Sequence, residues 1–404
     1  MTLKKDLIVK PNKIHLLRFF FLFLICQSDV LFAGLPPLSF SVKGKSWYHE
    51  IYPQPKDSLS KFERFNKKAE HLFTYIPAPI FSYSEEAGQT WGLAKFNLFD
   101  LYKDDTITMP SKISDVITIS TKGRVNFSMA TELPLKNNQY IIISYVNYKK
   151  TPEFIFGIGN DVKREDLENI EISSFKWDAI VLYKLAKAFY AGVNVDVAYY
   201  FNVKTDSTSF LIRDNVSGLS GGTNVGVGLS AAYDTRDNRY NASKGAYIIA
   251  TSLFCPKFFG STYEFSKFTL DARKYVQPWF KHIIAVQATT TVVNKDVPFY
   301  ELALMGGDNQ MRGYYKGALR DKVLVDGQIE YRMPVWSIFG VTGWIGTGRV
   351  AESYQKLSLN GLWLSYGAGL RLKVDSKHNT NLRFDFGFGP KGISGFYINF
   401  AEAF

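Results

Sequence analysis

Apolar and polar side chains alternate one by one along most of the chain, and this period-two pattern restricts the possible folds more than any other feature. Residues 192–203 show it most clearly, with Val193 and Val195 on one face and Asn194 and Asp196 on the other. The pattern predicts β-strands that each have one apolar face. It leaves two architectures open, a sandwich that buries its apolar faces and a barrel that presents them to lipid.

The composition favours the barrel. Aromatic residues make up 16% of the chain, with 33 Phe and 24 Tyr. After residue 33 the sequence has no continuous apolar run of the roughly 18 residues that a membrane-spanning helix needs. Aromatic residues at alternating positions are typical of outer-membrane β-barrels, which carry aromatic girdles at both membrane interfaces.

The connections between the expected strands mostly alternate between long and short. Long connections are expected at residues 100–114, 149–168, 204–221 and 295–321, and short ones at residues 132–137, 186–187, 277–281, 337–339 and 374–379. Two connections do not fit, because residues 234–244 are long for a short turn and residues 255–260 are short for a long loop. Long loops on one side and short turns on the other are typical of outer-membrane barrels.

We therefore predict an all-β fold, a transmembrane antiparallel β-barrel. Its strands are expected near residues 89–99, 115–132, 138–148, 169–185, 188–203, 222–234, 245–255, 261–277, 282–294, 322–333, 340–350, 361–373, 380–389 and 394–404. Residues 72–84 add at least one more strand, in which Pro77 and Pro79 either weaken an edge strand or precede it. Because bacterial barrels have an even number of strands, we expect 16 strands, with 14 as the alternative.

The first 33 residues have the pattern of a secretory signal peptide, with basic residues at the start, an apolar run of about ten residues and a small residue at Ala33. Residues 34–73 are expected to be a short periplasmic extension, which either covers the mouth of the barrel or is a linker or surface helix. Residues 74–404 are expected to form the barrel in the bacterial outer membrane. One helical stripe is predicted in the extension, made of Phe62, Phe65, Ala69 and Leu72.

The formal net charge of +11 would ordinarily suggest a nucleic-acid partner. An exported protein rarely meets nucleic acid, so we expect these charges to lie in the lumen and the loops. Only Cys255 would remain after signal peptide cleavage, which leaves neither an internal disulfide nor a cysteine metal site. We expect no nucleic acid, metal or cofactor.

One long segment interrupts the strand pattern, residues 306–322, which read GGDNQMRGYYKGALRDK. It is too long for a hairpin turn, and structured loops longer than about 12–15 residues are usually functional or disordered. Its tyrosines are bulky and amphipathic, and its arginines Arg312 and Arg320 would need carboxylates or carbonyls as partners if buried. The loop therefore either folds back onto the barrel or is a glycine-rich surface loop.

Four stretches in the last 170 or so residues resemble the bacterial surface antigen family, the superfamily of outer-membrane barrels that includes BamA, TamA and FhaC. They are DTRDNRYNASKGAY at 234–247, the segment at 306–322, GQIEYRMPV at 327–335 and GFYINFAEAF at 395–404. Members carry Val-Arg-Gly-Phe or Val-Arg-Gly-Tyr on an extracellular loop that folds into the lumen. Met311-Arg312-Gly313-Tyr314 matches this motif with Met in place of Val.

The resemblance implies a loop held in the lumen by an ion pair of Arg312. The family partner is an Asp in a Phe-x-Asp-x-Gly motif, but the matching residues 344–348 read WIGTG and lack it. Strand parity makes Glu330 and Asp385 the replacement candidates. The expected lumen-loop residues are Gly306, Gly307, Met311, Arg312, Gly313, Tyr314, Arg320 and Asp321, and Phe404 is the expected C-terminal barrel signal, an aromatic residue that ends the last strand.

The resemblance also implies a function. Members that insert or secrete proteins usually carry periplasmic POTRA domains, which residues 34–73 are too few to form, so a stand-alone barrel is expected. It would act in, or as an accessory to, protein insertion or translocation through a weak seam between the first and last strands. Its expected partners are lipid, unfolded client proteins and periplasmic or outer-membrane assembly subunits.

Three other functions compete with this one. A passive channel or small-molecule transporter would use lumen charges to set its selectivity, the expected ones being Lys267, Asp271, Arg273, Arg383 and Asp385. An enzyme is not expected, because no Ser/His/Asp set, paired carboxylates, HExxH, CxxC or phosphate-binding Gly-Lys-Ser/Thr motif is found. A structural role within an assembly complex would give the same sequence features.

Overall fold

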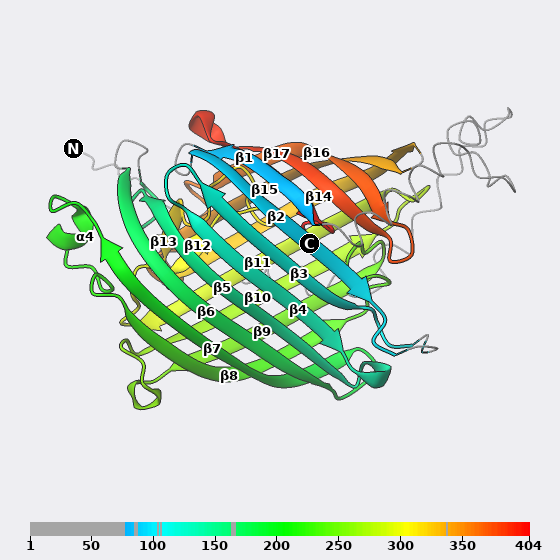
Figure 1. Cartoon of the computed structure of the whole chain (residues 1–404), viewed down its shortest axis with the longest axis horizontal. Coiled ribbons are helices and arrows are strands. Elements are labelled where there is room, and N and C mark those ends of the chain that lie inside the picture. Colours follow the sequence, from blue (N-terminus) through cyan, green and yellow to red (C-terminus); the bar gives the residue numbers. More distant parts are fainter. Residues whose placement is uncertain (1–76, 85–87, 103–104, 106, 163–166, 337) are drawn as a thin grey trace, which may run out of the picture. The chain divides into compact units, whose positions relative to one another are not determined.

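The computed structural model describes residues 77–84, 88–102, 105, 107–162, 167–336 and 338–404, all within the second of two units, Pro55–Phe404. The predicted signal peptide and the predicted extension at 34–73 lie outside these residues. Sixteen strands form one antiparallel sheet whose order follows the chain, and Figure 1 shows it curled into a nearly closed barrel. The prediction of an all-β barrel with 16 strands is confirmed.

The barrel strands are β1 (Ala78–Ser84), β2 (Gly88–Phe99), β3 (Ser111–Ser120), β4 (Val125–Pro134), β5 (Tyr140–Ile155), β6 (Glu168–Lys184), β7 (Phe189–Lys204), β8 (Gly222–Asp234), β9 (Gly245–Cys255), β10 (Phe265–Val276), β11 (Ile283–Lys295), β14 (Val323–Trp336), β15 (Phe339–Ala351), β16 (Trp363–Asp375), β17 (Thr380–Phe388) and β18 (Ser394–Phe400). The short strands β12 (Ala303–Met305) and β13 (Leu319–Asp321) pair with each other in the connection from β11 to β14. The helices are short, α4 (Phe210–Arg213), η1 (Lys136–Asn138), η3 (Lys257–Phe259), η4 (Tyr354–Lys356) and η5 (Pro390–Gly392). Within the described ranges, no helix has the length and apolarity needed to cross a membrane.

The apolar faces of the strands point outward and the polar faces point into the barrel. On β7, for example, Val193 and Tyr199 are exposed, whereas Asn194 and Tyr200 are buried. Buried charged residues follow the same rule on the later strands, where Glu330 and Asp385 are fully buried. An apolar exterior around a polar interior is the arrangement that a barrel needs in lipid.

One expected strand is two strands. The prediction of a single strand over residues 115–132 is wrong, because the chain turns at residues 121–124 between β3 and β4. Gly123 has a φ of 79°, and its amide donates a hydrogen bond to the Ser120 carbonyl over 3.1 Å. The turn falls in the run Ser-Thr-Lys-Gly-Arg at residues 120–124, which contains no apolar residue, and the apolar residues on both sides keep the same parity. The extra strand places the loop before β3 at the end of the barrel that carries the short turns, not with the long loops as predicted.

The sheet has two free edges, because no backbone pairing joins β1 to β18 among the described residues. These are the shortest strands of the barrel, with seven residues each, and Pro79 lies within β1 while Pro77 precedes it. Among the described residues, side-chain contacts bridge the gap near the short-turn end. Phe96 of β2 stacks on Phe400 of β18 with ring centroids 5.3 Å apart, and Lys377 pairs with Asp100 over 2.5 Å.

The last four residues leave the sheet and enter the barrel. The prediction that the last strand runs to Phe404 is wrong, because β18 ends at Phe400 and Ala401 has a φ of 64°. Phe404 is buried in a cluster that includes Tyr275 and Ala285, and its carbonyl accepts a hydrogen bond from Arg332 over 2.8 Å. Lumen arginines thus draw the end of the chain inward, and a terminal aromatic residue lies inside the barrel instead of on its lipid face.

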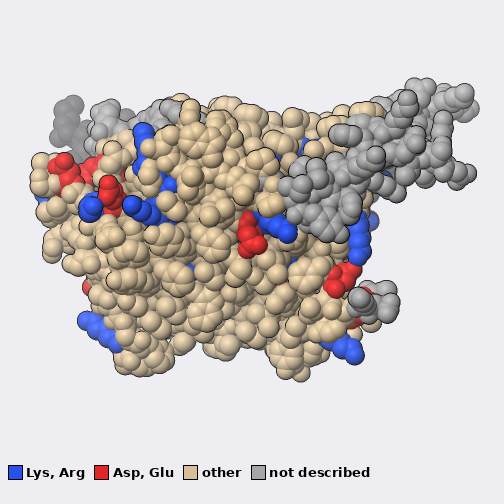
Figure 2. Space-filling model, in the orientation of Figure 1, with Lys and Arg blue, Asp and Glu red and all other residues tan. Residues whose placement is uncertain are grey.

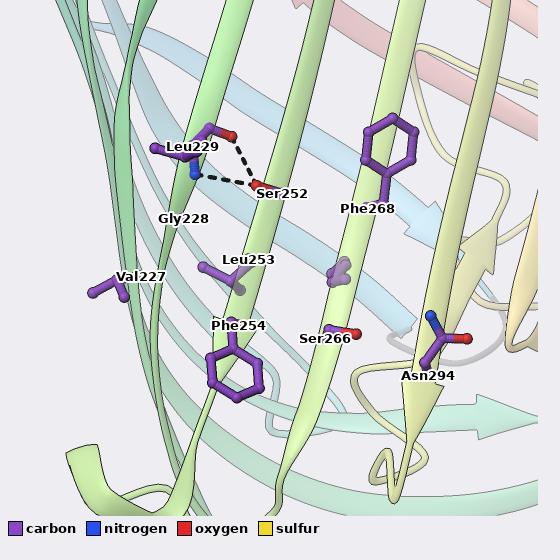
Figure 3. A pocket seen from close by; sticks show the side chains of 10 residues that line it. Val227, Gly228, Leu229, Ser252, Leu253, Phe254, Ser266, Phe268 and Asn294 are labelled. Atoms are coloured by element: carbon purple, nitrogen blue, oxygen red, sulfur yellow. Dashed lines mark hydrogen bonds between the residues drawn. The ribbon is translucent and has the colours of Figure 1, made fainter.

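The pairing of β8 with β9 is interrupted beside a hollow of about 290 Å³ in the outer wall (Figure 3). Val227 pairs with Phe254 and Ser230 pairs with Thr251, but no backbone pair lies between them. The Ser252 hydroxyl fills the gap, since its Oγ accepts from the Leu229 amide over 3.1 Å and donates to the Leu229 carbonyl over 3.2 Å. This side chain therefore replaces part of the backbone ladder.

Candidate functional site

The connection between β11 and β14, residues 296–322, folds back into the barrel and is called the lumen loop here. Its middle lies directly on the inner wall. The Gly313 amide donates to the Tyr397 hydroxyl on β18 over 3.0 Å, and the Ser365 hydroxyl on β16 donates to the Arg312 carbonyl over 2.6 Å. A Cβ on Gly387 of β17 would come within 2.5 Å of the Arg312 backbone, so only glycine allows so close an approach.

Arg312 is fully buried between two carboxylates. Its Nη2 lies 2.5 Å from Glu330 Oε2 on β14, and its Nη1 lies 2.8 Å from Asp385 Oδ2 on β17. The guanidinium plane also covers the Trp344 ring on β15, with 3.7 Å between the guanidinium carbon and the ring centroid. Both partners suggested by strand parity, Glu330 and Asp385, therefore contact Arg312. Trp344 is the first residue of the WIGTG stretch, which lacks the family Asp.

Further arginines surround these carboxylates. Arg371 donates to Asp385 Oδ1 over 2.6 Å and Arg332 donates to Glu330 Oε1 over 2.7 Å. Glu402, from the inserted tail, accepts from Arg371 over 2.7 Å. The group comprises four arginines and three carboxylates, Arg312, Arg332, Arg371, Arg383, Glu330, Asp385 and Glu402, and is called the arginine cluster here. It connects the lumen loop to the tail through buried charges.

The residues just before the motif are tied to the same wall. Arg383 donates to the Asp308 carbonyl over 2.9 Å and to the Asn309 side-chain oxygen over 2.6 Å. The Asn399 side chain donates to Asp308 Oδ2 over 2.6 Å, and Gln328 donates to the Asn309 carbonyl over 2.6 Å. These contacts come from β14, β17 and β18, so this wall holds both the backbone and the side chains of the loop.

The two charged residues at the end of the loop behave differently from Arg312. Arg320 is buried and donates to the Gly317 carbonyl over 3.0 Å, while its own carbonyl accepts from the Gly159 amide over 2.9 Å. Asp321 accepts a hydrogen bond from the Lys322 amide over 2.7 Å. Within the described part of the chain they form no ion pair with each other. Their contacts shape the loop and join it to the β5–β6 connection, where Asn160 in turn donates to the Gly361 carbonyl over 2.9 Å.

The remaining predicted loop residues provide shape and packing. Gly306, Gly307, Gly313 and Gly317 have φ values between 86° and 131°, a range that favours glycine. Met311 has a φ of 45° and is buried with Tyr314, whose hydroxyl donates to the Leu364 carbonyl over 2.7 Å. The structure thus brings the whole Met311-Arg312-Gly313-Tyr314 motif against the wall.

A second anchor lies at the start of the lumen loop, in a stretch that sequence reasoning left out. Glu301 is buried, and its Oε1 lies 2.8 Å from Lys176 Nζ on β6 and accepts from the Tyr200 hydroxyl on β7 over 2.5 Å. Lys267 on β10 lies 3.4 Å from Glu301 Oε2. A signal was available in the sequence, because Phe299, Tyr300 and Leu302 form an apolar run around Glu301 inside a supposed loop.

The two anchors attach the lumen loop to opposite walls. In the order of the sheet, β7 and β17 are separated by half of the 16 strands, as are β6 and β16. Glu301 is bound by β6, β7 and, over 3.4 Å, Lys267 of β10, and Arg312 by β14 and β17. The loop therefore crosses the lumen and is held at both sides by buried ion pairs.

Replacing Arg312 with alanine should cost about 3–5 kcal/mol of unfolding free energy, because Glu330 and Asp385 stay buried with one fewer cation. Arg312→Lys should lose less unfolding free energy than Arg312→Ala. A lysine keeps the positive charge but loses the simultaneous contact with both carboxylates and the contact with the Trp344 ring. Urea unfolding of the refolded barrel measures both. Arg213→Ala, in an exposed pair on α4, is the matched control and should change stability little. A cost below about 1 kcal/mol for Arg312→Ala would contradict the anchor.

The Glu301 anchor should weaken in acid. Burial by itself would raise the pKa of Glu301, but Lys176, Lys267 and the Tyr200 hydroxyl lower that pKa from 4.5 to about 2. A lowered pKa means that the anchor contributes fully above about pH 4.5 and is lost as the pH falls towards 2. The contribution is on the order of 3 kcal/mol. Protease accessibility of the lumen loop, compared between the wild type and Glu301→Gln, measures it, and equal pH dependence of both proteins would contradict it.

Comparisons with known proteins give one family and several solved structures to which the chain is similar. The Omp85 superfamily domain matches residues 183–404, more than half of the chain. CdiB from Acinetobacter baumannii is 11% identical with a TM-score of 0.50, over 80% of this chain and 58% of that chain. BamA from Haemophilus ducreyi lacking POTRA domains 1-3 is 12% identical with a TM-score of 0.48, over 89% and 81%. CdiB from Escherichia coli is 10% identical with a TM-score of 0.49, over 88% and 73%.

No protein of curated function matches the sequence. At identities this low, the likeness to solved structures concerns the fold alone. The family match is stronger because it covers every strand from β7 to β18. It supports, at a coarse level, an outer-membrane location and a role in protein insertion or translocation. The chain belongs to the Omp85 superfamily.

Proposed function

We propose that the protein acts in, or as an accessory to, the insertion or translocation of proteins at the bacterial outer membrane, after export with a cleaved signal peptide. The observation that carries this proposal is the lumen loop, which is tied to opposite walls through Glu301 and Arg312. A lumen crossed in this way offers little room for a polypeptide or solutes to pass. The free edges of β1 and β18 are then the place where a strand of a client protein can pair with the barrel.

The alternative function, a passive channel or small-molecule transporter, fits the lumen charges less well. The charges expected to set selectivity are bound within the protein: Lys267 pairs with Glu301, Arg273 with Asp271, and Arg383 with Asp385. Two of these three pairs involve the lumen loop or the arginine cluster. Charges occupied in this way hold the structure together and are less available to passing ions.

The partners follow from the same proposal. The apolar exterior would contact outer-membrane lipid, and unfolded client proteins would reach the seam from the side of the short turns. Periplasmic or outer-membrane subunits would deliver those clients.

Deletion of residues 306–321 should convert a small, flickering current into a large and steady one, because these residues hold the lumen loop against the β14–β18 wall. Single-channel recording of the purified barrel in a planar bilayer measures the change. A deletion of residues 257–259 in the β9–β10 connection, which contains the exposed Phe258, is the control and should leave the current small. A large, ion-selective wild-type current that the loop deletion leaves unchanged would favour the passive channel.

Cross-linking across the seam should abolish the assistance that the barrel gives to the folding of client proteins, because a closed seam has no free edge for a client strand to pair with. Phe96→Cys and Phe400→Cys, whose parent rings stack across the gap, can be joined by a short bismaleimide linker. The cross-linked protein is placed in proteoliposomes, and a small outer-membrane barrel is added to them in unfolded form. The fraction of this client that becomes resistant to protease measures how much of it has folded. Ala130→Cys with Tyr145→Cys, on the paired strands β4 and β5, is the control cross-link and should preserve the help. Equal activity of both cross-linked proteins would show that the seam is not used.

A further inference from the structure

A lysine and an aspartate lie on the membrane-facing side of two neighbouring strands beside the seam. Lys95 of β2 is directly opposite Asp115 of β3 in the register. Each shares the outward parity of exposed apolar neighbours, Leu93 on β2 and Ile117 on β3, whereas Ala94 between Leu93 and Lys95 is buried. Both charged side chains therefore belong to the outer face and not to the lumen.

This position is costly for an isolated barrel. On β3, Asp115 lies between the outward residues Ile113 and Ile117, so it belongs to the apolar band. A lysine at the middle of the lipid face of a barrel costs roughly 2–4 kcal/mol, less near the interfaces. Figure 2 shows a red and blue patch over β2 and β3 in the middle of a wall that is otherwise mostly tan. Among the described residues, no hydrogen bond or ion pair joins Lys95 to Asp115.

We propose that this face, made of Trp91, Leu93, Lys95, Asp115, Ile117 and Ile119, binds a second copy of the chain within the membrane. The arrangement is self-complementary. If a two-fold axis runs parallel to the barrel axis, β2 of one copy faces β3 of the other, and Lys95 of each copy meets Asp115 of its partner. Two reciprocal ion pairs then form at one level of the membrane, surrounded by the exposed apolar residues of the same face.

The charges explain why a second copy fits better than lipid. Lipid chains offer no partner to either charge, whereas the second copy offers one for each, and the apolar residues above them supply ordinary packing. The surface adjoins β1, so the dimer would place the two seams on either side of one interface. The inference does not depend on the proposed function, because it concerns only the outer face.

Cysteine cross-linking in membranes tests the arrangement. A bismaleimide linker of about 10 Å should join Leu93→Cys in one tagged copy to Ile117→Cys in a differently tagged copy, because both positions lie two residues along the tilted strands from the charged pair at the axis. Val193→Cys on β7, equally outward and exposed, is the matched control and should give at least about tenfold less product. Cys255 is buried and can remain in all variants.

Charge reversal distinguishes an ion pair of Lys95 with Asp115 of the second copy from an ion pair between the two residues of one copy. Lys95→Asp in both copies, or Asp115→Lys in both, should reduce the cross-linked product about tenfold or more, because like charges then face each other. Lys95→Asp in one copy together with Asp115→Lys in the other should restore it, although each copy alone carries two like charges. Protease resistance of the folded barrel identifies any variant that has not folded. Equal cross-linking in all charge combinations, no cross-link with the native charges, or a cross-link to a different protein would overturn the proposal.

Discussion

The buried guanidinium of Arg312 is the interaction on which the inside of the barrel depends. It joins the lumen loop to Glu330 and Asp385, and through them to Arg371, Arg332 and the carboxylate of Glu402. Buried charges are expensive unless each has partners, so the members of the arginine cluster require one another. The arginine cluster therefore joins the lumen loop, three strands and the tail into one structural unit.

The second anchor gives that unit its effect on the lumen. Glu301 binds Lys176 and Tyr200 on one wall, and Arg312 binds the facing wall, so the loop is under constraint at two distant points. A loop fixed at one end only could swing aside and leave a pore. Fixed at both ends, the loop divides the lumen, and the proposed function at the seam rests on this division.

The fold could be predicted from the sequence because the period of two is a local property, visible in each strand by itself. The turn at residues 121–124 escaped prediction because the apolar residues on both sides of it, such as Ile119 and Phe127, keep the same parity, although residues 120–124 include no apolar side chain. Parity along the strands was enough to select Glu330 and Asp385 for Arg312. Glu301 and Glu402 could not be placed, because their positions depend on where a loop and a tail lie in three dimensions, and strand periodicity says nothing about either. Phe404 was assigned to the strand end for the same reason.

The two-wall attachment of the lumen loop also constrains the order in which the protein can assemble. A segment bound at both sides of a cylinder cannot be threaded into it afterwards without breaking buried ion pairs. The strands must therefore wrap around the loop while the sheet is still open. Because Glu402 and Arg371 complete the cluster, its last contacts need residues 401–404 in place inside the barrel. Closure of the wall and packing of its interior are thus a single late event in folding.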